Sequence, residues 1–304
     1  MSDHDFIIKM RAEKMKKDYE SSGYPETVTE ISKEEIMLPM RDGKRMRTIL
    51  YKPTNTNQYP VIFRRTCYPN DEPLIIIDAE NFSKRGYCFI YQFCRGTGGS
   101  EGTWLPNVNE REDGIDMVNW IWNQPWCESL GYWGLSYSSL TGWIISDCIK
   151  GKVNSMFLLH YGTDRFISAY HKGLFHHDIL TGWSMQNAGF SIKADYEKSC
   201  LYMPQIEVDE NLWGHKLNWY RDYVSNECFD DDYWQNGLWK NLREIPKSVE
   251  SIGALAFKDC SKLDHIEIHS PLKEIKESTF KNCCSLANIG IPQSLTSIKM
   301  LAFE

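Results

Sequence analysis

The stretch Gly131-Tyr-Trp-Gly-Leu-Ser136-Tyr-Ser-Ser-Leu-Thr-Gly-Trp143 decides the fold that we expect for this chain. It predicts a short apolar strand, a sharp turn at Ser136 and a helix that starts at once, the pattern of a nucleophile elbow. Gly134 allows a close approach of the backbone before the turn. At position 138 the motif has glycine, because the strand and helix backbones nearly touch there, but this chain has Ser138. From these residues alone, a serine in an ordinary strand-to-helix loop remains an alternative.

The sequence before and after the elbow predicts a parallel sheet. Residues 59–66, 87–93 and 153–160 are almost continuously apolar, as expected for strands that are buried on both faces. Helical patterns at about 74–84 and 109–123 separate them, and strands that alternate with helices indicate βαβ units. Two further strand-like runs join at Arg41-Asp42-Gly43, a hairpin signal.

The periodicity divides the chain into four segments. We expect a helical lead-in at 1–27, an α/β core at 28–163, an aromatic-rich helical cap at 164–241 and a repeat segment at 242–304. In the last segment, apolar residues recur 23 positions apart, as in Ile252, Ile275 and Ile298 or Phe257, Phe280 and Phe303. A fixed period of this length predicts a solenoid.

Composition excludes several classes of function. The net charge of -7 leaves no basic surface for nucleic acid. The chain contains neither an 18-residue apolar run nor a signal-peptide pattern, so we expect no membrane segment and a cytoplasmic protein. The ten cysteines lack metal-ligand spacing, and we therefore expect neither a metal nor a cofactor.

Seven motifs in this order resemble the cocaine esterase and X-prolyl dipeptidyl-peptidase family of α/β-hydrolases over about residues 28–240. They are Met40-Arg-Asp-Gly43, Arg65-Thr-Cys-Tyr68, Arg95-Gly-Thr-Gly-Gly-Ser-Glu-Gly102, Glu112-Asp113, Trp120-Ile121, Gln124-Pro-Trp126 and Gly134-Leu-Ser-Tyr137. The resemblance implies that Ser136 is the acylating nucleophile for a small ester or amide. It also implies that the Tyr137 N–H and the Tyr68 hydroxyl form the oxyanion hole, an arrangement that acyl transfer requires. A tyrosine that only packs on its loop is the alternative for Tyr68.

The chain departs from this family in three places. Phe93 replaces an acidic residue before the glycine-rich loop, and Ser138 replaces the elbow glycine. The family's acid and histidine follow the cap, but the pattern is lost near Trp239, so we expect a hydrolase whose C-terminal part is truncated. Asp164 is a candidate acid. The eight histidines are His4, His160, His171, His176, His177, His215, His265 and His269, and none is assigned as the base.

The repeat segment resembles BspA-type leucine-rich repeats, with Leu263, Ile266 and Ile268 expected on a core-facing strand and Phe257 and Cys260 in the next layer. Such solenoids bind proteins through an extended face. Two functions from different classes follow. The first is a serine esterase or X-prolyl peptidase that acts through Ser136. The second is a catalytically inactive hydrolase fused to a leucine-rich-repeat module that binds a protein partner.

Overall fold

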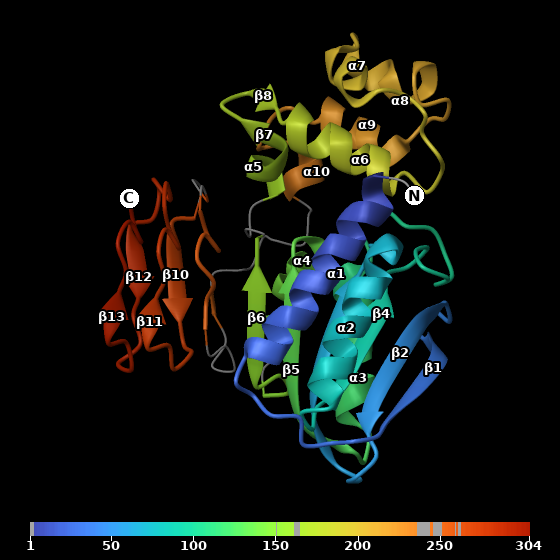
Figure 1. Ribbon diagram of the computed structural model, residues 1–304. Helices are drawn as coiled ribbons and strands as arrows, with labels where there is room; N and C mark the ends of the chain where they lie inside the picture. Colours follow the sequence, from blue (N-terminus) through green and yellow to red (C-terminus); the bar gives the residue numbers. More distant parts are fainter. Residues whose placement is uncertain are drawn as a thin grey trace.

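The computed structural model describes residues 3–149, 151–160, 165–235, 244–245, 251–258, 260 and 263–304. These residues form a sheet flanked by helices, a helical cap above it and a stack of short parallel strands beside it (Figure 1). Both predicted boundaries of the cap, near residues 163 and 241, lie outside the described residues.

The central sheet has six strands in the order β1-β2-β4-β3-β5-β6. Their bounds are Ile31–Pro39 (β1), Arg45–Pro53 (β2), Tyr59–Thr66 (β3), Cys88–Phe93 (β4), Cys127–Leu135 (β5) and Ser155–Leu159 (β6). β1 and β2 form the predicted hairpin, and β2 pairs antiparallel with β4. β3 pairs in parallel with β4 and with β5, and β5 pairs in parallel with β6, which confirms an α/β fold.

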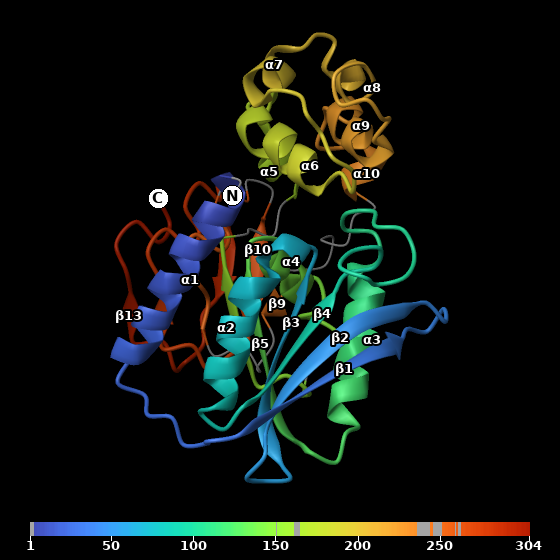
Figure 2. The same cartoon turned by 45° about the vertical axis from the view of Figure 1, so that its right-hand side comes forward.

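Helices cover both faces of the sheet. Their bounds are Asp3–Ser21 (α1), Pro69–Asp71 (η1, a 3-10 turn), Glu72–Ser83 (α2), Glu110–Trp122 (α3) and Tyr137–Trp143 (α4). α2 packs on one face through Ile75 and Ala79, whereas α3 and α4 bury Met117 and Leu140 against the other (Figure 2). All six residues of β4 are therefore buried. No helix in the described part of the chain is both long and apolar enough to cross a membrane.

The cap lies above the carboxyl ends of the parallel strands (Figure 1). Its elements are Arg165–Ala169 (α5), Tyr170–His171 (β7), Leu174–Phe175 (β8), His177–Thr181 (η2, a π-helical turn), Gly182–Asn187 (α6), Tyr196–Leu201 (α7), Gln205–Glu207 (η3), Val208–Asn211 (α8), Asn218–Ser225 (α9) and Asp232–Gln235 (α10). A small β7–β8 hairpin accompanies the helices that we expected. The aromatic residues of this segment, including Trp213, Tyr220 and Tyr223, form a hydrophobic core of the cap's own.

The repeat segment forms parallel strands that pair with a shift of one repeat. The strands are Glu244–Ile245 (β9), His265–Ile268 (β10), Glu274–Ile275 (β11), Asn288–Gly290 (β12) and Ser297–Ile298 (β13). Ile266 of β10 pairs with Ile289 of β12, and Ile275 of β11 pairs with Ile298 of β13. The rings of Phe257, Phe280 and Phe303 stack in a column, with centroids 5.0 and 5.3 Å apart. The 23-residue period of the sequence therefore equals the offset between paired residues of neighbouring strands in the stack.

The stack packs against the sheet at β6, which is the last strand of the sheet in the described residues. Phe257 makes an edge-to-face contact with Trp143 at 5.3 Å, and Ile252 shares a hydrophobic core with Leu158 of β6. The backbones also approach closely, because a Cβ atom at Gly253 would lie 2.7 Å from the carbonyl oxygen of Leu158. Apolar side chains of the stack therefore cover a sheet edge that would otherwise be open.

Candidate active site

Ser136 occupies the turn between β5 and α4, as the elbow pattern predicted. Its backbone has φ 57° and ψ -128°, a region that residues other than glycine seldom adopt. Such a conformation costs about 1–3 kcal/mol and persists only where neighbouring structure enforces it. The turn requires Gly134, since a Cβ atom there would lie 2.3 Å from the carbonyl oxygen of Ser138.

Strand β6 holds the strained turn in place. The Ser136 N–H donates to the carbonyl oxygen of Leu159 at 2.9 Å, and the Ser139 hydroxyl donates to the same oxygen at 2.6 Å. Ser138, which stands where the motif has glycine, is fully buried, and its hydroxyl lacks a hydrogen-bond partner within the described residues. The elbow accommodates a serine side chain at this position but provides no partner for its hydroxyl.

Tyr68, Ser136 and Tyr137, the three residues that the family resemblance singles out, lie together. Tyr68 Oη lies 3.2 Å from Ser136 Oγ, and it accepts a hydrogen bond of 3.1 Å from Trp183 Nε1. Burial raises the pKa of the Tyr68 hydroxyl well above its usual value, and the nearby Cys67 thiol raises it further. Tyr68 therefore keeps its proton at neutral pH and can act as a donor.

Two neighbours of these residues were missed in the sequence. Trp183 of α6 was one of 11 tryptophans, with no local signal that it contacts Tyr68. Glu110, at the start of α3, accepts a hydrogen bond of 2.6 Å from the Tyr137 hydroxyl. Burial raises the pKa of the Glu110 carboxyl, while the Tyr137 hydrogen bond and the Arg65 charge lower it. Nothing in the acidic pattern of this helix distinguished Glu110 from its solvent-facing neighbours.

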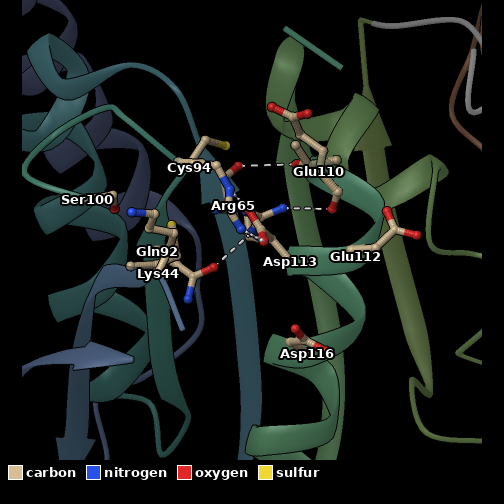
Figure 3. Close-up of polar contacts among 12 residues, drawn as sticks. Lys44, Arg65, Gln92, Cys94, Ser100, Glu110, Glu112, Asp113 and Asp116 are labelled. Carbon is tan, nitrogen blue, oxygen red and sulfur yellow. Dashed lines mark hydrogen bonds and ion pairs between the residues drawn. The ribbon is translucent and has the colours of Figure 1, made fainter. Parts of the chain in front are cut away.

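A buried charge network lies behind the site (Figure 3). Arg65 is fully buried and donates to the carbonyl oxygen of Glu110 at 2.8 Å and to Gln92 Oε1 at 2.9 Å. Its Nη2 lies 3.4 Å from the carboxylate of Asp113, which also pairs with Arg95 at 2.7 Å. These contacts join residues from three of the motifs in this sequence, and they fasten β3, the glycine-rich loop and α3 to one another.

The glycine-rich loop has its own supports in place of an acid at Phe93. Arg95 pairs with Asp42 of the hairpin at 2.6 Å as well as with Asp113. Ser100 Oγ donates to the Phe93 carbonyl oxygen at 2.8 Å, and the Arg47 guanidinium lies 5.2 Å from the centre of the Phe93 ring. The loop is thus anchored without the acidic residue that the family usually has there.

The described residues do not complete a catalytic triad. In this part of the chain, Tyr68 is the hydrogen-bond partner of Ser136 Oγ, and no histidine is hydrogen-bonded to that oxygen. His160 is exposed just after β6, and in the cap the rings of His171 and His176 stack on each other at 5.9 Å. Asp164, the candidate acid, lies outside the described residues. Within those residues, no three His, Cys, Asp or Glu side chains gather as metal ligands would.

The chain is similar to known proteins over most of its length. The sequence model of a family described as X-Pro dipeptidyl-peptidase (S15 family) matches residues 42–274. We expected the resemblance to end near residue 240, but the match continues into the repeat stack. Cocaine esterase of Rhodococcus sp. (strain MB1 Bresler) is 25% identical over 226 residues, covering 66% of this chain and 39% of that protein.

Two solved structures share the fold. They are an α-amino acid ester hydrolase and an aminopeptidase from the marine sediment archaeon Thaumarchaeota archaeon, each with a TM-score of 0.55 and 18% identity. The first similarity covers 71% of this chain and 40% of the hydrolase, and the second covers 85% and 46%. The chain thus spans less than half the length of these relatives.

Proposed function

This chain belongs to the X-Pro dipeptidyl-peptidase (S15) family, and we propose that it is a serine hydrolase of the esterase or X-prolyl peptidase type. It transfers the acyl group of a small ester or amide to Ser136. One observation supports this most strongly: a strained serine at a strand-to-helix turn has a protonated tyrosine hydroxyl 3.2 Å from its Oγ. The backbone N–H of Tyr137 supplies the second donor, as acyl transfer requires.

The proposed reaction has two steps, the acylation of Ser136 and the hydrolysis of the acyl-enzyme. Ser136 Oγ attacks the carbonyl carbon, and the resulting oxyanion accepts hydrogen bonds from the Tyr68 hydroxyl and the Tyr137 N–H. The carbon–oxygen or carbon–nitrogen bond to the leaving group then breaks, which leaves an acyl-enzyme that water hydrolyses.

The proton that Ser136 loses passes to solvent water and from there to the leaving group, since no described histidine is hydrogen-bonded to Ser136 Oγ to carry it. Oxyanion stabilisation and binding alone retain about 10³–10⁴-fold acceleration in serine hydrolases that lack triad members. Activated aryl esters, whose leaving groups depart as stable anions, are therefore the substrates on which we expect the highest rates.

Hydrolysis of p-nitrophenyl acetate tests the proposal. Ser136→Ala should remove the enzymatic rate, and Tyr68→Phe should lower kcat by about 10²-fold because one oxyanion donor is lost. Ser138→Ala is the matched control, since it removes a buried hydroxyl two residues from Ser136 that has no partner in the described residues. Equal rates for Ser136→Ala and the unchanged protein would refute the assignment of the nucleophile.

We propose a second function for the repeat stack: a BspA-type leucine-rich-repeat module that binds a protein partner. The 23-residue sequence period and the parallel pairing of Ile266 with Ile289 support this assignment. A folded protein that neither hydrolyses activated esters nor reacts at Ser136 would favour this candidate, in which an inactive hydrolase domain carries the binding module.

A further inference from the structure

We propose that Trp183, from helix α6 of the cap, is a positioning residue that directs the hydroxyl proton of Tyr68 at Ser136. The inference rests on the proposed function, because it assigns a role within the same oxyanion hole. Trp183 does not touch Ser136 itself and acts through Tyr68.

The direction of the Tyr68 proton follows from its neighbours. An indole N–H can only donate, so Tyr68 Oη must be the acceptor in its 3.1 Å hydrogen bond with Trp183 Nε1. In the described residues, Ser136 Oγ is the other hydrogen-bond partner of Tyr68 Oη, 3.2 Å away, so the single proton of Tyr68 is directed at Ser136. The same proton is then in place for the oxyanion that replaces the substrate carbonyl.

Packing fixes the indole of Trp183. Its ring stacks on Tyr137 at 5.9 Å with an interplanar angle of 22° and meets Trp219 of the cap edge-to-face at 5.7 Å. Trp183 packs against the hydrophobic core of the sheet and also against that of the cap. The position of the cap therefore decides whether Tyr68 has this donor, and a cap that moved away would leave the Tyr68 proton without a fixed direction.

The alternative interpretation is that Trp183 only fills space under the cap, and Trp104 provides a control for it. Trp104 also packs against both cores, and its ring lies 5.5 Å from that of Trp183. Its indole N–H is buried but has no hydrogen-bond partner in the described part of the chain. Replacing either tryptophan with phenylalanine removes the same atoms, but only at Trp183 does this remove a donor to Tyr68.

Kinetics with p-nitrophenyl acetate distinguish the two interpretations. We expect Trp183→Phe to lower kcat about five- to tenfold with KM within about twofold, the size expected for one neutral hydrogen bond. Trp104→Phe should leave kcat within about twofold while lowering the melting temperature as much as Trp183→Phe does. In a Tyr68→Phe background, Trp183→Phe should cause no further loss, because the residue through which it acts is absent. Equal kcat losses in the two tryptophan variants, or a full loss in the Tyr68→Phe background, would overturn the inference.

The hydrogen bond can also be tested without activity. In protein labelled with ¹⁵N-tryptophan, the indole signal that disappears in Trp183→Phe should shift in Tyr68→Phe, while the signal of Trp104 should stay in place. An unshifted Trp183 signal overturns the inference even if Ser136 is reactive. If the unchanged protein shows no activity but the Trp183 signal shifts, the proposed function fails while the positioning of Tyr68 stands.

Discussion

The sheet and the repeat stack both consist of parallel strands, yet different interactions hold them together. Behind the sheet's carboxyl edge, Arg65 and Asp113 are buried and join three segments that are distant in sequence. In the stack, each layer repeats the one before, so that Phe257, Phe280 and Phe303 pack ring on ring. The sheet depends on a particular set of polar contacts, whereas the stack depends on repetition.

This difference explains why the candidate chemistry lies in the sheet. A catalytic site needs unlike groups at one place, and the sheet brings Tyr68 to Ser136 and Glu110 to Tyr137 at the elbow. A stack of like layers presents the same residue types again and again, which suits packing and extended binding surfaces. The two regions meet at β6 and at the end of α4, where Phe257, the first ring of the column, packs against Trp143.

The largest expected effect is that of Gly134→Ala. The new methyl group would lie 2.3 Å from a backbone oxygen and 2.6 Å from a backbone carbon of Ser138, which cannot move without breaking the elbow. We expect a loss of more than about 4 kcal/mol in the free energy of unfolding, measured by urea denaturation. Gly131→Ala in the same strand is the control, since its nearest contact would be an ordinary 3.6 Å. Similar losses of stability in the two variants would mean that the elbow does not require glycine at position 134.

Phe257→Ala tests whether the stack depends on its contact with the sheet. Phe257 is fully buried between Trp143 and Phe280, so we expect a loss of about 4 kcal/mol in the free energy of unfolding. Phe303→Ala, at the far end of the column, should cost only about 1 kcal/mol because that ring is 45% exposed. Equal losses in the free energy of unfolding for the two variants would mean that the contact of Phe257 with Trp143 does not stabilise the stack.

Asp113→Asn tests the polar network of the sheet. The change removes the carboxylate that forms an ion pair with buried Arg65, and we expect a loss of about 3 kcal/mol in stability. The control is Asp116→Asn, one turn later on α3, whose partner Arg41 is 49% exposed; it should cost less than about 1 kcal/mol. Chemical denaturation measures the free energy of unfolding of both variants. A smaller loss for Asp113→Asn than for Asp116→Asn would contradict the role of the buried network.

The smallest expected effect is a gain. Ser138→Ala removes a buried hydroxyl that has no hydrogen-bond partner in the described residues, so we expect about 1 kcal/mol of added stability. Thermal unfolding of the variant and of the unchanged protein provides the comparison. A loss of stability instead would show that Ser138 makes a contact through its hydroxyl.

Much of the sheet could be predicted from the sequence because its signals are local. The apolar run at 59–66 matches β3 at both ends, and the turn at Arg41-Asp42-Gly43 joins β1 and β2. The 23-residue repeat period reappears in the strand pairing of the stack, since parallel layers place equivalent residues such as Ile266 and Ile289 beside one another. Ser136 and Tyr68 were found through family motifs, and the structure places their side chains within hydrogen-bonding distance.

Contacts between distant segments could not be predicted in this way. Trp183 lies 115 positions from Tyr68, and the packing of the cap on the sheet alone brings them together. Glu110 looked like any other acid of an amphipathic helix, because its burial depends on where Tyr137 ends up in the fold. The cover over the β6 edge could not be predicted either, since a repeat period does not determine what its first layer packs against.

The measurement that tests the central claim most directly is labelling with a fluorophosphonate probe, followed by mass spectrometry of the modified peptide. The account predicts that the probe modifies Ser136, that Ser136→Ala abolishes the labelling and that Ser138→Ala retains it. A well-folded protein without labelling, or with labelling at another residue, would contradict the claim that this elbow carries a reactive serine.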